Sequence, residues 1–288
     1  MQGLSLFCPA KINLGLAVIG RRDDGFHDIE SYLACISLGD TLYLSPASSF
    51  NLQLSGTPGV PADRRNLVCR AADLFAKAAE IEVKLSLQLA KRIPPGSGLG
   101  GGSSDAAATL LGLNHYYGGP LGKDDLHELA ARLGSDVPFF LMGGTALATG
   151  RGEVLESRSI PREQYLVLAL PQAAVSTAWA YLQLTEVDFG PLDRESIERW
   201  LAGGEKPSSL PNAFTRPVCA TFPIIERSID LLQQAGLEAV SMTGSGAACF
   251  GLSKDAETAV RISRELESRG IAAVPTRIRE GGVTLKEA

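Results

Sequence analysis

Apolar residues recur at every second position in several stretches of the N-terminal half, and this spacing predicts β-strands. The alternation is clearest over 12–18 and 83–89, a β-like run also covers 26–38, and the residues over 42–44 and 50–54 suggest further strands. Gly39-Asp40 follows the run over 26–38 and predicts a turn. The first half of the chain is therefore expected to be built on a sheet.

Apolar residues three and four positions apart predict helices between these strands. Asn66 begins one such pattern, which continues to residue 78, and a second pattern over 106–117 follows a glycine-rich loop. A third pattern opens with Asp124-Asp125, which suit the first turn of a helix. Strands and helices of this kind indicate a mixed α/β lobe.

The pattern changes near 157–162, where the chain becomes polar and contains Pro161. We therefore expect a first lobe over 1–158, completed by β-rich residues 145–157, and a second lobe over 159–288. The elements expected in the second lobe have the order of a ferredoxin-like α/β plait. They are a strand over 164–170, a short helix capped by Ser176-Thr177, helices near 193–202 and 222–235, strands over 239–242 and 247–252, a helix over 255–268 and a strand over 271–278.

The densest glycine run of the chain lies between the strand over 83–89 and the helix over 106–117. It reads Pro94-Pro95-Gly96-Ser97-Gly98-Leu99-Gly100-Gly101-Gly102-Ser103-Ser104-Asp105. Glycines let the backbone approach a ligand closely, and its last three residues are helix N-cap types. A strand, a glycine loop and a helix N-terminus in that order suit the binding of an anion, above all a phosphate.

Several known phosphate loops do not fit this stretch. A P-loop requires a lysine after the glycines, and none follows here. The G-x-G-x-x-G spacing is present at residues 96–101, but Asp124-Asp125, at the distance of a Rossmann acid, open a helix instead of ending a strand. The H-R-D and D-F-G motifs of protein kinases do not occur. A flexible linker is the remaining alternative, and the flanking prolines and cap residues argue against it.

Composition narrows the range of partners. The net charge of −5 gives no reason to expect nucleic acid or an anionic membrane as a partner, and no apolar run is long enough to span a bilayer. No leader-like segment is recognised at the start. Five scattered cysteines without a C-x-x-C pair predict reduced thiols in the cytoplasm, each acting as a small buried hydrophobe.

Three residues and one short segment outside the glycine loop each have two interpretations. Lys11 shares a strand face with Asn13 opposite the apolar row, and would ordinarily be solvated. Asp136 precedes a short helix with Pro138 in its first turn, where it could be only an N-cap. Residues 243–246, Thr-Gly-Ser-Gly, could be a simple hairpin turn, and Phe26 could be a core residue.

The glycine loop resembles the phosphate loop of the GHMP small-molecule kinases. Further motifs resemble the same family and occur in the family's order over essentially the whole chain. They are Pro-Ala-Lys-Ile-Asn-Leu at 9–14, Arg-Asp-Asp-Gly-Phe-His at 22–27, Gly-Ser-Asp-Val-Pro-Phe-Phe at 134–140 and Thr-Gly-Ser-Gly at 243–246. The first two narrow the resemblance to the branch that acts on a cytidyl substrate.

The resemblance implies an α+β protein with the two-lobed GHMP kinase fold, which uses ATP and Mg²⁺. It implies phosphorylation of the 2-hydroxyl of 4-diphosphocytidyl-2-C-methyl-D-erythritol, a small-molecule substrate, by a monomer or homodimer. Asp136 would be the catalytic base and Lys11 its partner, because a carboxylate can accept the hydroxyl proton and an ammonium keeps that carboxylate ionised.

The resemblance also assigns the binding residues. The rings of Phe26 and Tyr181 would clamp the cytosine, with His27 bonding its edge. Ser104 is the candidate metal ligand. The ATP-binding set is Asn66, Leu67, Lys91, Pro94, Gly96, Ser97, Gly98, Leu99, Gly100, Gly101, Gly102, Ser103 and Ser104, and the substrate-binding set is Asn13, Phe26, His27, Thr177, Tyr181, Thr243, Gly244, Ser245 and Gly246.

Two rival functions share this scaffold. Another GHMP kinase could act on homoserine, mevalonate or a sugar, but those substrates would not need the Phe26-His27 pair. A nucleotide-binding regulator without activity is the second rival, and the presence of both Lys11 and Asp136 argues against it.

Overall fold

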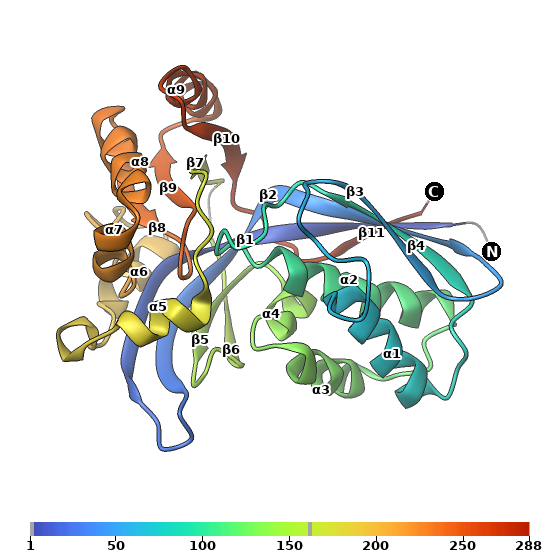
Figure 1. The fold of residues 1–288 in the computed structure, drawn as a ribbon. Coiled ribbons are helices and arrows are strands. Elements are labelled where there is room, and N and C mark those ends of the chain that lie inside the picture. The colour runs from blue at the N-terminus through green and yellow to red at the C-terminus, as the bar shows by residue number, and fades with distance from the viewer. Residues whose placement is uncertain (1–2, 161–162, 288) are drawn as a thin grey trace.

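The computed structural model describes residues 3–160 and 163–287, which fold into two lobes around separate β-sheets (Figure 1). The larger sheet has the strand order β11-β1-β2-β4-β3, and β5 pairs with β2 and β6. Its strands are β1 (Leu4–Arg21), β2 (His27–Pro46), β3 (Asn51–Gly56), β4 (Leu85–Lys91), β5 (Thr145–Thr149), β6 (Val154–Arg158) and β11 (Thr284–Glu287).

Four helices cover one face of this sheet (Figure 1). They are α1 (Leu67–Ala79), α2 (Gly101–Tyr116), α3 (Lys123–Leu133) and α4 (Val137–Met142). The apolar side chains of the helices and the inward face of the strands form one core, in which Phe75 of α1 and Leu110 of α2 are fully buried. Helix α2 lies directly against β1 and β2, so its N-terminus is held at a fixed place on the sheet.

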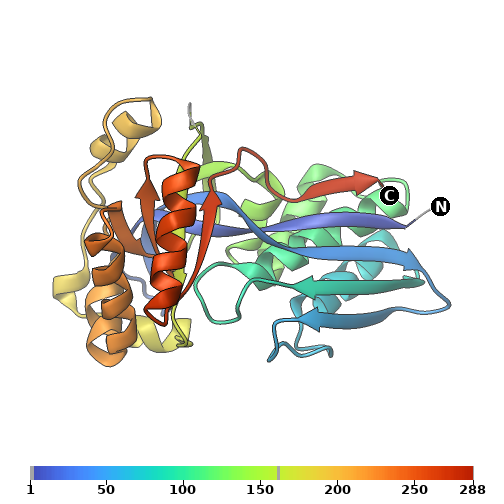
Figure 2. The same cartoon turned by 90° about the horizontal axis from the view of Figure 1, so that it is seen from above.

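The second lobe has a four-stranded antiparallel sheet in the order β10-β7-β9-β8. Its strands are β7 (Tyr165–Leu170), β8 (Glu238–Met242), β9 (Cys249–Ser253) and β10 (Ala272–Arg277), and its helices are α5 (Thr177–Gln183), the 3₁₀ turn η1 (Glu186–Asp188), α6 (Arg194–Leu201), α7 (Thr215–Thr221), α8 (Pro223–Gln234) and α9 (Ala256–Ser268). The order β7-α8-β8-β9-α9-β10 is the expected ferredoxin-like plait. Figure 2 shows this lobe at the end of the first sheet that lies away from the N and C labels.

The structure departs from the sequence-based expectations about local structure in three further places. Strand β2 runs unbroken through Gly39 and Asp40, so there is no turn. A Cβ at Gly39 would lie 2.4 Å from Cζ of Phe7, and the glycine therefore serves close packing of a ring on the strand. Helix α7 was missed because its seven residues are too few to show a period and no side chain caps its start, unlike the equally short α5.

The third departure concerns the end of the second lobe, which the sequence-based division extended to residue 288. Residues 284–287 instead form β11, which pairs with β1 from Leu4↔Glu287 to Phe7↔Thr284. The strands on either side of the expected division, β6 and β7, do belong to different sheets. Among the described residues, no helix combines the length and apolar character that a membrane span needs.

Candidate active site

A cavity of about 1170 Å³ lies between the two lobes. Nearly all of the residues expected in the site lie at its wall. The exceptions are Ser104, Thr243 and Gly246. The wall contains Lys11, Asn13, Phe26, His27, Asn66, Leu67, Lys91, Pro94, Gly96, Ser97, Gly98, Leu99, Gly100, Gly101, Gly102, Ser103, Asp136, Thr177, Tyr181, Gly244 and Ser245.

The glycine loop joins β4 to α2, as predicted, but the helix begins earlier than expected. Gly100 is its N-cap, with a φ of +71°, and no side chain caps the helix. Ser103, Ser104 and Asp105 lie inside the helix and are not its cap. The first N–H groups of a helix have no acceptor within the helix, and here they belong to residues that line the cavity. The site therefore offers N–H donors and the positive end of a helix dipole to an anion.

The turn between β8 and β9 packs directly on the glycine loop. A Cβ at Gly98 would lie 2.2 Å from the backbone oxygen of Thr243, so only glycine permits this approach. On the cavity side, the hydroxyls of Thr177 and Ser245 lie 3.0 Å apart. The turn therefore connects two antiparallel strands, as a hairpin turn does, and it also forms part of the cavity wall.

Lys11 is buried on β1 and is not solvated. Its Nζ donates to Oδ1 of Asn13 at 2.7 Å, and that oxygen also accepts the N–H of Gly244 at 2.8 Å and the hydroxyl of Thr243 at 3.1 Å. Nδ2 of Asn13 donates to the hydroxyl of Ser31 at 2.7 Å. One amide therefore connects the ammonium of the first lobe to the glycine turn of the second.

Asp136 precedes α4 but does not cap it. It occupies the N-cap position with helical dihedral angles, and its side chain makes no capping hydrogen bond. Asp136 is one of the residues that line the cavity. The alternative in which Asp136 serves only as a cap therefore has no support in this geometry.

The charges of Lys11 and Asp136 act on each other. Burial lowers the pKa of Lys11, and the negative charge of Asp136 works against that decrease. The pKa of Tyr181 is raised to about 12, chiefly by burial and also by Asp136. Asp136 is therefore within electrostatic range of the first-lobe lysine and of a second-lobe ring.

The three rings expected at the cytosine site, those of Phe26, His27 and Tyr181, belong to residues that line the same cavity. His27 stacks on Tyr181, with ring centroids 4.8 Å apart and 27° between the planes. The ring of Phe26 is 54% exposed, and the guanidinium of Arg151 lies 5.0 Å from its centroid. Burial and the nearby charge of Arg21 lower the pKa of His27, which favours the neutral imidazole. A base that enters between Phe26 and Tyr181 would have to displace the His27 ring.

Asn66 and Lys91, which were expected near adenine, have side chains that already bind other groups of the protein. Oδ1 of Asn66 accepts the N–H of Val68 at 2.9 Å and so caps α1, while Nδ2 donates to the backbone oxygen of Pro61 at 2.7 Å. Lys91 forms ion pairs with two buried carboxylates. Leu67 remains as an apolar contact for a ring.

Three residues with roles at or beside this cavity were missed from the sequence. Arg21 and Arg151 line it, although each reads as part of a turn. The sequence did contain a signal for Arg21, which lies close to the Phe26-His27 motif. The diphosphate of a cytidyl substrate is negatively charged, so a cation near that motif could have been expected. Asp40 was taken for a turn residue, and it instead binds Lys91.

Magnesium is usually held by one or two carboxylates together with the phosphates of a bound nucleotide. The described residues contain no group of three His, Cys, Asp or Glu side chains placed to hold a metal ion without such phosphates. The hydroxyl of Ser104 is buried with no partner in the described part of the chain, yet it does not reach the cavity wall. The assignment of Ser104 as a metal ligand stays a prediction.

Comparisons with known proteins agree with the two-lobed fold. The family model of the GHMP kinases N terminal domain matches residues 66–144, and that of the GHMP kinases C terminal domain matches residues 202–272. A Deinococcus radiodurans protein named 4-diphosphocytidyl-2-C-methyl-D-erythritol kinase is 45% identical over 266 residues, which cover 91% of this chain and 88% of that protein.

Solved structures extend the comparison. A crystal structure of 4-(cytidine 5'-diphospho)-2C-methyl-D-erythritol kinase is 39% identical, with a TM-score of 0.85 over 96% of this chain and 100% of that one. A homoserine kinase from Cytophaga hutchinsonii is 19% identical, with a TM-score of 0.75 over 99% of this chain and 98% of that one, and shares the fold alone.

Proposed function

The chain belongs to the GHMP kinase family and, within it, to the 4-diphosphocytidyl-2-C-methyl-D-erythritol kinases, and from this premise we propose how its residues carry out the reaction. The reaction is ATP-dependent phosphorylation of the 2-hydroxyl of 4-diphosphocytidyl-2-C-methyl-D-erythritol in isoprenoid precursor synthesis. We propose Asp136 as the general base and Lys11 as the cation beside the reacting oxygens.

One observation carries this proposal: Lys11, Asp136 and the glycine loop line a single cavity between the lobes. The hydroxyl oxygen forms the new bond to the γ-phosphorus as the bond from that phosphorus to the ADP oxygen breaks, and the hydroxyl proton passes to the Asp136 carboxylate. The ammonium of Lys11 stabilises the charge that develops on oxygen. Phosphoryl transfer requires positioning and charge stabilisation more than covalent chemistry, and these groups supply both.

The glycine loop and the N-terminus of α2 are proposed to bind the ATP phosphates. The N–H groups of Gly101, Gly102 and Ser103 begin the helix at the cavity wall, which supports this assignment. Leu67 would contact the adenine ring. Mg²⁺ is proposed to arrive as a complex with ATP, because the described residues offer no site for it alone.

The cytidyl group is proposed to bind on the opposite side of Lys11, among the rings of Phe26, His27 and Tyr181. A neutral imidazole can both donate and accept hydrogen bonds at a base edge. The exposed ring of Phe26 is available for stacking without loss of core packing. Binding would move His27 off Tyr181, and the two guanidinium groups at this wall, of Arg21 and Arg151, suit the substrate diphosphate.

Release of ADP tests the proposed function directly. The purified protein is incubated with MgATP and one of four acceptors: the cytidyl alcohol, homoserine, mevalonate or galactose. We expect ADP release that depends on the cytidyl alcohol alone. Release with another acceptor and none with the cytidyl alcohol would assign a different substrate, and ATP binding without release would indicate a regulator.

The location and assembly state are proposals of the same kind. The five cysteines are buried and unpaired in the described part of the chain, which supports a reducing cytoplasm. We propose a monomer or homodimer, which light scattering of the purified protein distinguishes.

A further inference from the structure

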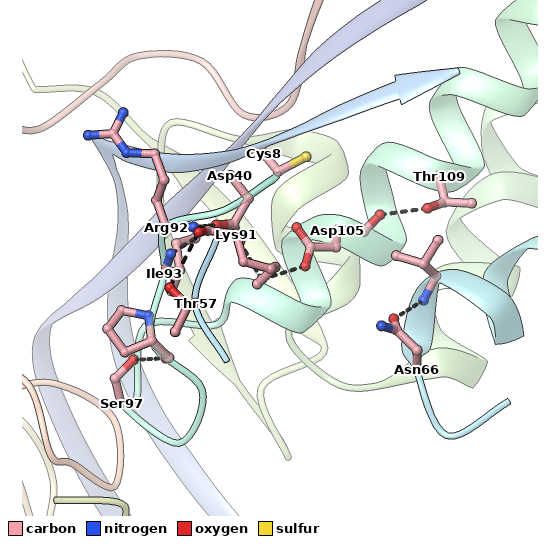
Figure 3. Close-up of polar contacts among 12 residues, drawn as sticks. Cys8, Asp40, Thr57, Asn66, Lys91, Arg92, Ile93, Ser97, Asp105 and Thr109 are labelled. Carbon is pink, nitrogen blue, oxygen red and sulfur yellow. Dashed lines mark hydrogen bonds and ion pairs between the residues drawn. The ribbon is translucent and has the colours of Figure 1, made fainter. Parts of the chain in front are cut away.

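A buried ion cluster lies beneath the glycine loop (Figure 3). Asp40 of β2 is 0% exposed, Lys91 at the end of β4 is 5% exposed, and Asp105 of α2 is 2% exposed. The ammonium of Lys91 donates to Oδ2 of Asp40 and, at 2.6 Å, to Oδ2 of Asp105. One lysine thus joins a strand of the sheet to the helix that follows the loop.

Asp40 has a second set of partners that Asp105 lacks. Its Oδ1 accepts the backbone N–H groups of Arg92 at 2.5 Å and Ile93 at 2.8 Å. These are the first two residues after β4, and Pro94 follows them directly. The carboxylate therefore sets the direction in which the chain leaves the strand and starts the glycine loop.

The start and the end of the loop meet at this cluster. A Cβ at Gly101, the first residue of α2, would lie 2.8 Å from Cγ2 of Ile93 and 3.3 Å from Nζ of Lys91. Lys91 and Asp105 reach the cavity wall, whereas Asp40 does not. Asp40 is therefore placed to act on the loop from behind, without touching a bound molecule.

Stability alone does not account for such a cluster. Buried ion pairs are often no more stabilising than apolar residues of similar size, because the charges lose their hydration. Here one ammonium serves two carboxyl groups in a buried place. The two bonds from Asp40 to the loop backbone are what an apolar replacement could not provide.

We propose that Asp40 is a positioning residue of the nucleotide site. It acts through the backbone of Arg92 and Ile93 to hold the glycine loop in the form that binds the ATP phosphates. The inference rests on the proposed function only in taking the loop as the ATP site.

Three variants separate this role from a general effect of charge. Asp40→Ala removes both the loop contacts and one partner of Lys91. Asp40→Asn keeps an oxygen for the two N–H groups, and Asp105→Asn changes the same lysine's other partner while leaving the loop contacts intact. MgATP affinity is measured by calorimetry, and amide hydrogen exchange is followed in a peptide containing residues 92 and 93.

We expect Asp40→Ala to weaken MgATP binding by about tenfold or more, because small displacements of a positioning backbone have large effects. Exchange at residues 92 and 93 should become faster in this variant. In Asp40→Asn and Asp105→Asn, the MgATP affinity and the exchange rate at residues 92 and 93 should each stay within about threefold of the wild-type value. Affinity for the cytidyl alcohol should not change in any of them.

Equal weakening of MgATP binding by Asp40→Ala and Asp105→Asn would overturn the proposal, since only charge on Lys91 would then matter. Unchanged exchange at residues 92 and 93 in Asp40→Ala would also overturn it. If Asp40→Ala does not fold, Asp40→Ser replaces it with the same expected results. If the wild-type protein binds no ATP, the proposed function fails, and the exchange data alone still decide whether Asp40 holds the loop.

Discussion

The ammonium of Lys11 donates a hydrogen bond of 2.7 Å to Oδ1 of Asn13, two residues along the same strand. The oxygen that receives it also accepts the N–H of Gly244 from the second lobe. The position of the proposed catalytic ammonium therefore depends on the contact between the lobes. A disturbance of this contact should be seen in turnover before it is seen in ATP binding.

Asn13→Ala should lower kcat by about 100-fold, because Lys11 loses the acceptor that orients it. The KM for ATP should change much less. Ser31→Ala is the control, since it removes the partner of the other end of the Asn13 amide, together with a bond to the backbone oxygen of Gly15, and leaves the acceptor of Lys11 in place. An increase in the KM of the cytidyl alcohol with unchanged kcat would instead make Asn13 a substrate ligand.

Asp136→Asn should reduce kcat by about 10²–10⁴-fold, the usual contribution of a general base. The amide has the shape of the carboxylate but cannot accept the hydroxyl proton. Because Asp136 makes no capping bond, the melting temperature should stay close to the wild-type value. Calorimetry should show that the cytidyl alcohol still binds, and near-normal turnover in the folded variant would remove Asp136 from the mechanism.

Gly102→Ala should weaken MgATP binding by about tenfold while leaving the melting temperature unchanged or higher. A Cβ at this position would meet only Cδ1 of Leu67, at 3.6 Å, and alanine favours a helix over glycine. The methyl group would stand where the phosphates approach the backbone. Gly190→Ala, where a Cβ would meet nothing within 4 Å, is the matched control away from the cavity. Unaltered ATP affinity in Gly102→Ala would argue against the phosphate-loop assignment.

Gly100 is a poorer choice for the same experiment. A Cβ there would lie 2.9 Å from Cζ of Phe140 and 3.2 Å from Cγ of Lys11, and the backbone has a φ of +71°. A substitution would strain the fold and move the ammonium together with the loop. Its effect on turnover could not be assigned to ATP binding.

Phe26→Ala should weaken binding of the cytidyl alcohol by roughly ten- to a hundredfold, as loss of a base-stacking ring does elsewhere. MgATP affinity should not change. Tyr43→Ala is a fair control, because Tyr43 is 47% exposed on β2 and lies outside the cavity wall. Wild-type affinity in the folded Phe26→Ala variant would remove this ring from the cytidyl site.

The cluster beneath the loop predicts a pH dependence of stability. Burial raises the pKa of Asp105 to about 7, the nearby Asp40 carboxylate adds to the increase, and Lys91 opposes it. The folded protein therefore keeps a proton that the unfolded chain loses above about pH 4, so its stability falls as the pH rises toward 7 and then levels off. Urea unfolding should show a steeper decrease between about pH 4 and about pH 7 for the wild type than for Asp105→Asn. Parallel stability curves for the wild type and Asp105→Asn would contradict the raised pKa of Asp105.

Local patterns in the sequence were enough to predict the glycine loop, the strand before it and the helix after it. They also located Asp136 beside a short helix, because proline in a first turn and the preceding acid are local signals. The start of α2 was misplaced because Ser103, Ser104 and Asp105 have the residue types of a cap, whereas Gly100 provides the required left-handed backbone.

The remaining features depend on contacts between distant parts of the chain. Asp40 binds Lys91, which lies 51 residues away, so the local sequence Gly-Asp suggested only a turn. The stacking of His27 on Tyr181 depends on how the lobes meet. Strand β11 is short and largely polar, and pairing with β1 is what makes it a strand.

The return of β11 to the first sheet decides how the second lobe is connected to the first. In topological terms it is an insertion, because β6 before it and β11 after it both belong to the larger sheet. The returning segment is also fastened to β2, where Ile278 bridges Ile36 and the N–H of Arg279 donates to the oxygen of Cys35 at 2.9 Å. Local unfolding of the second lobe would therefore leave the strands on both sides of it, β6 and β11, paired in the larger sheet.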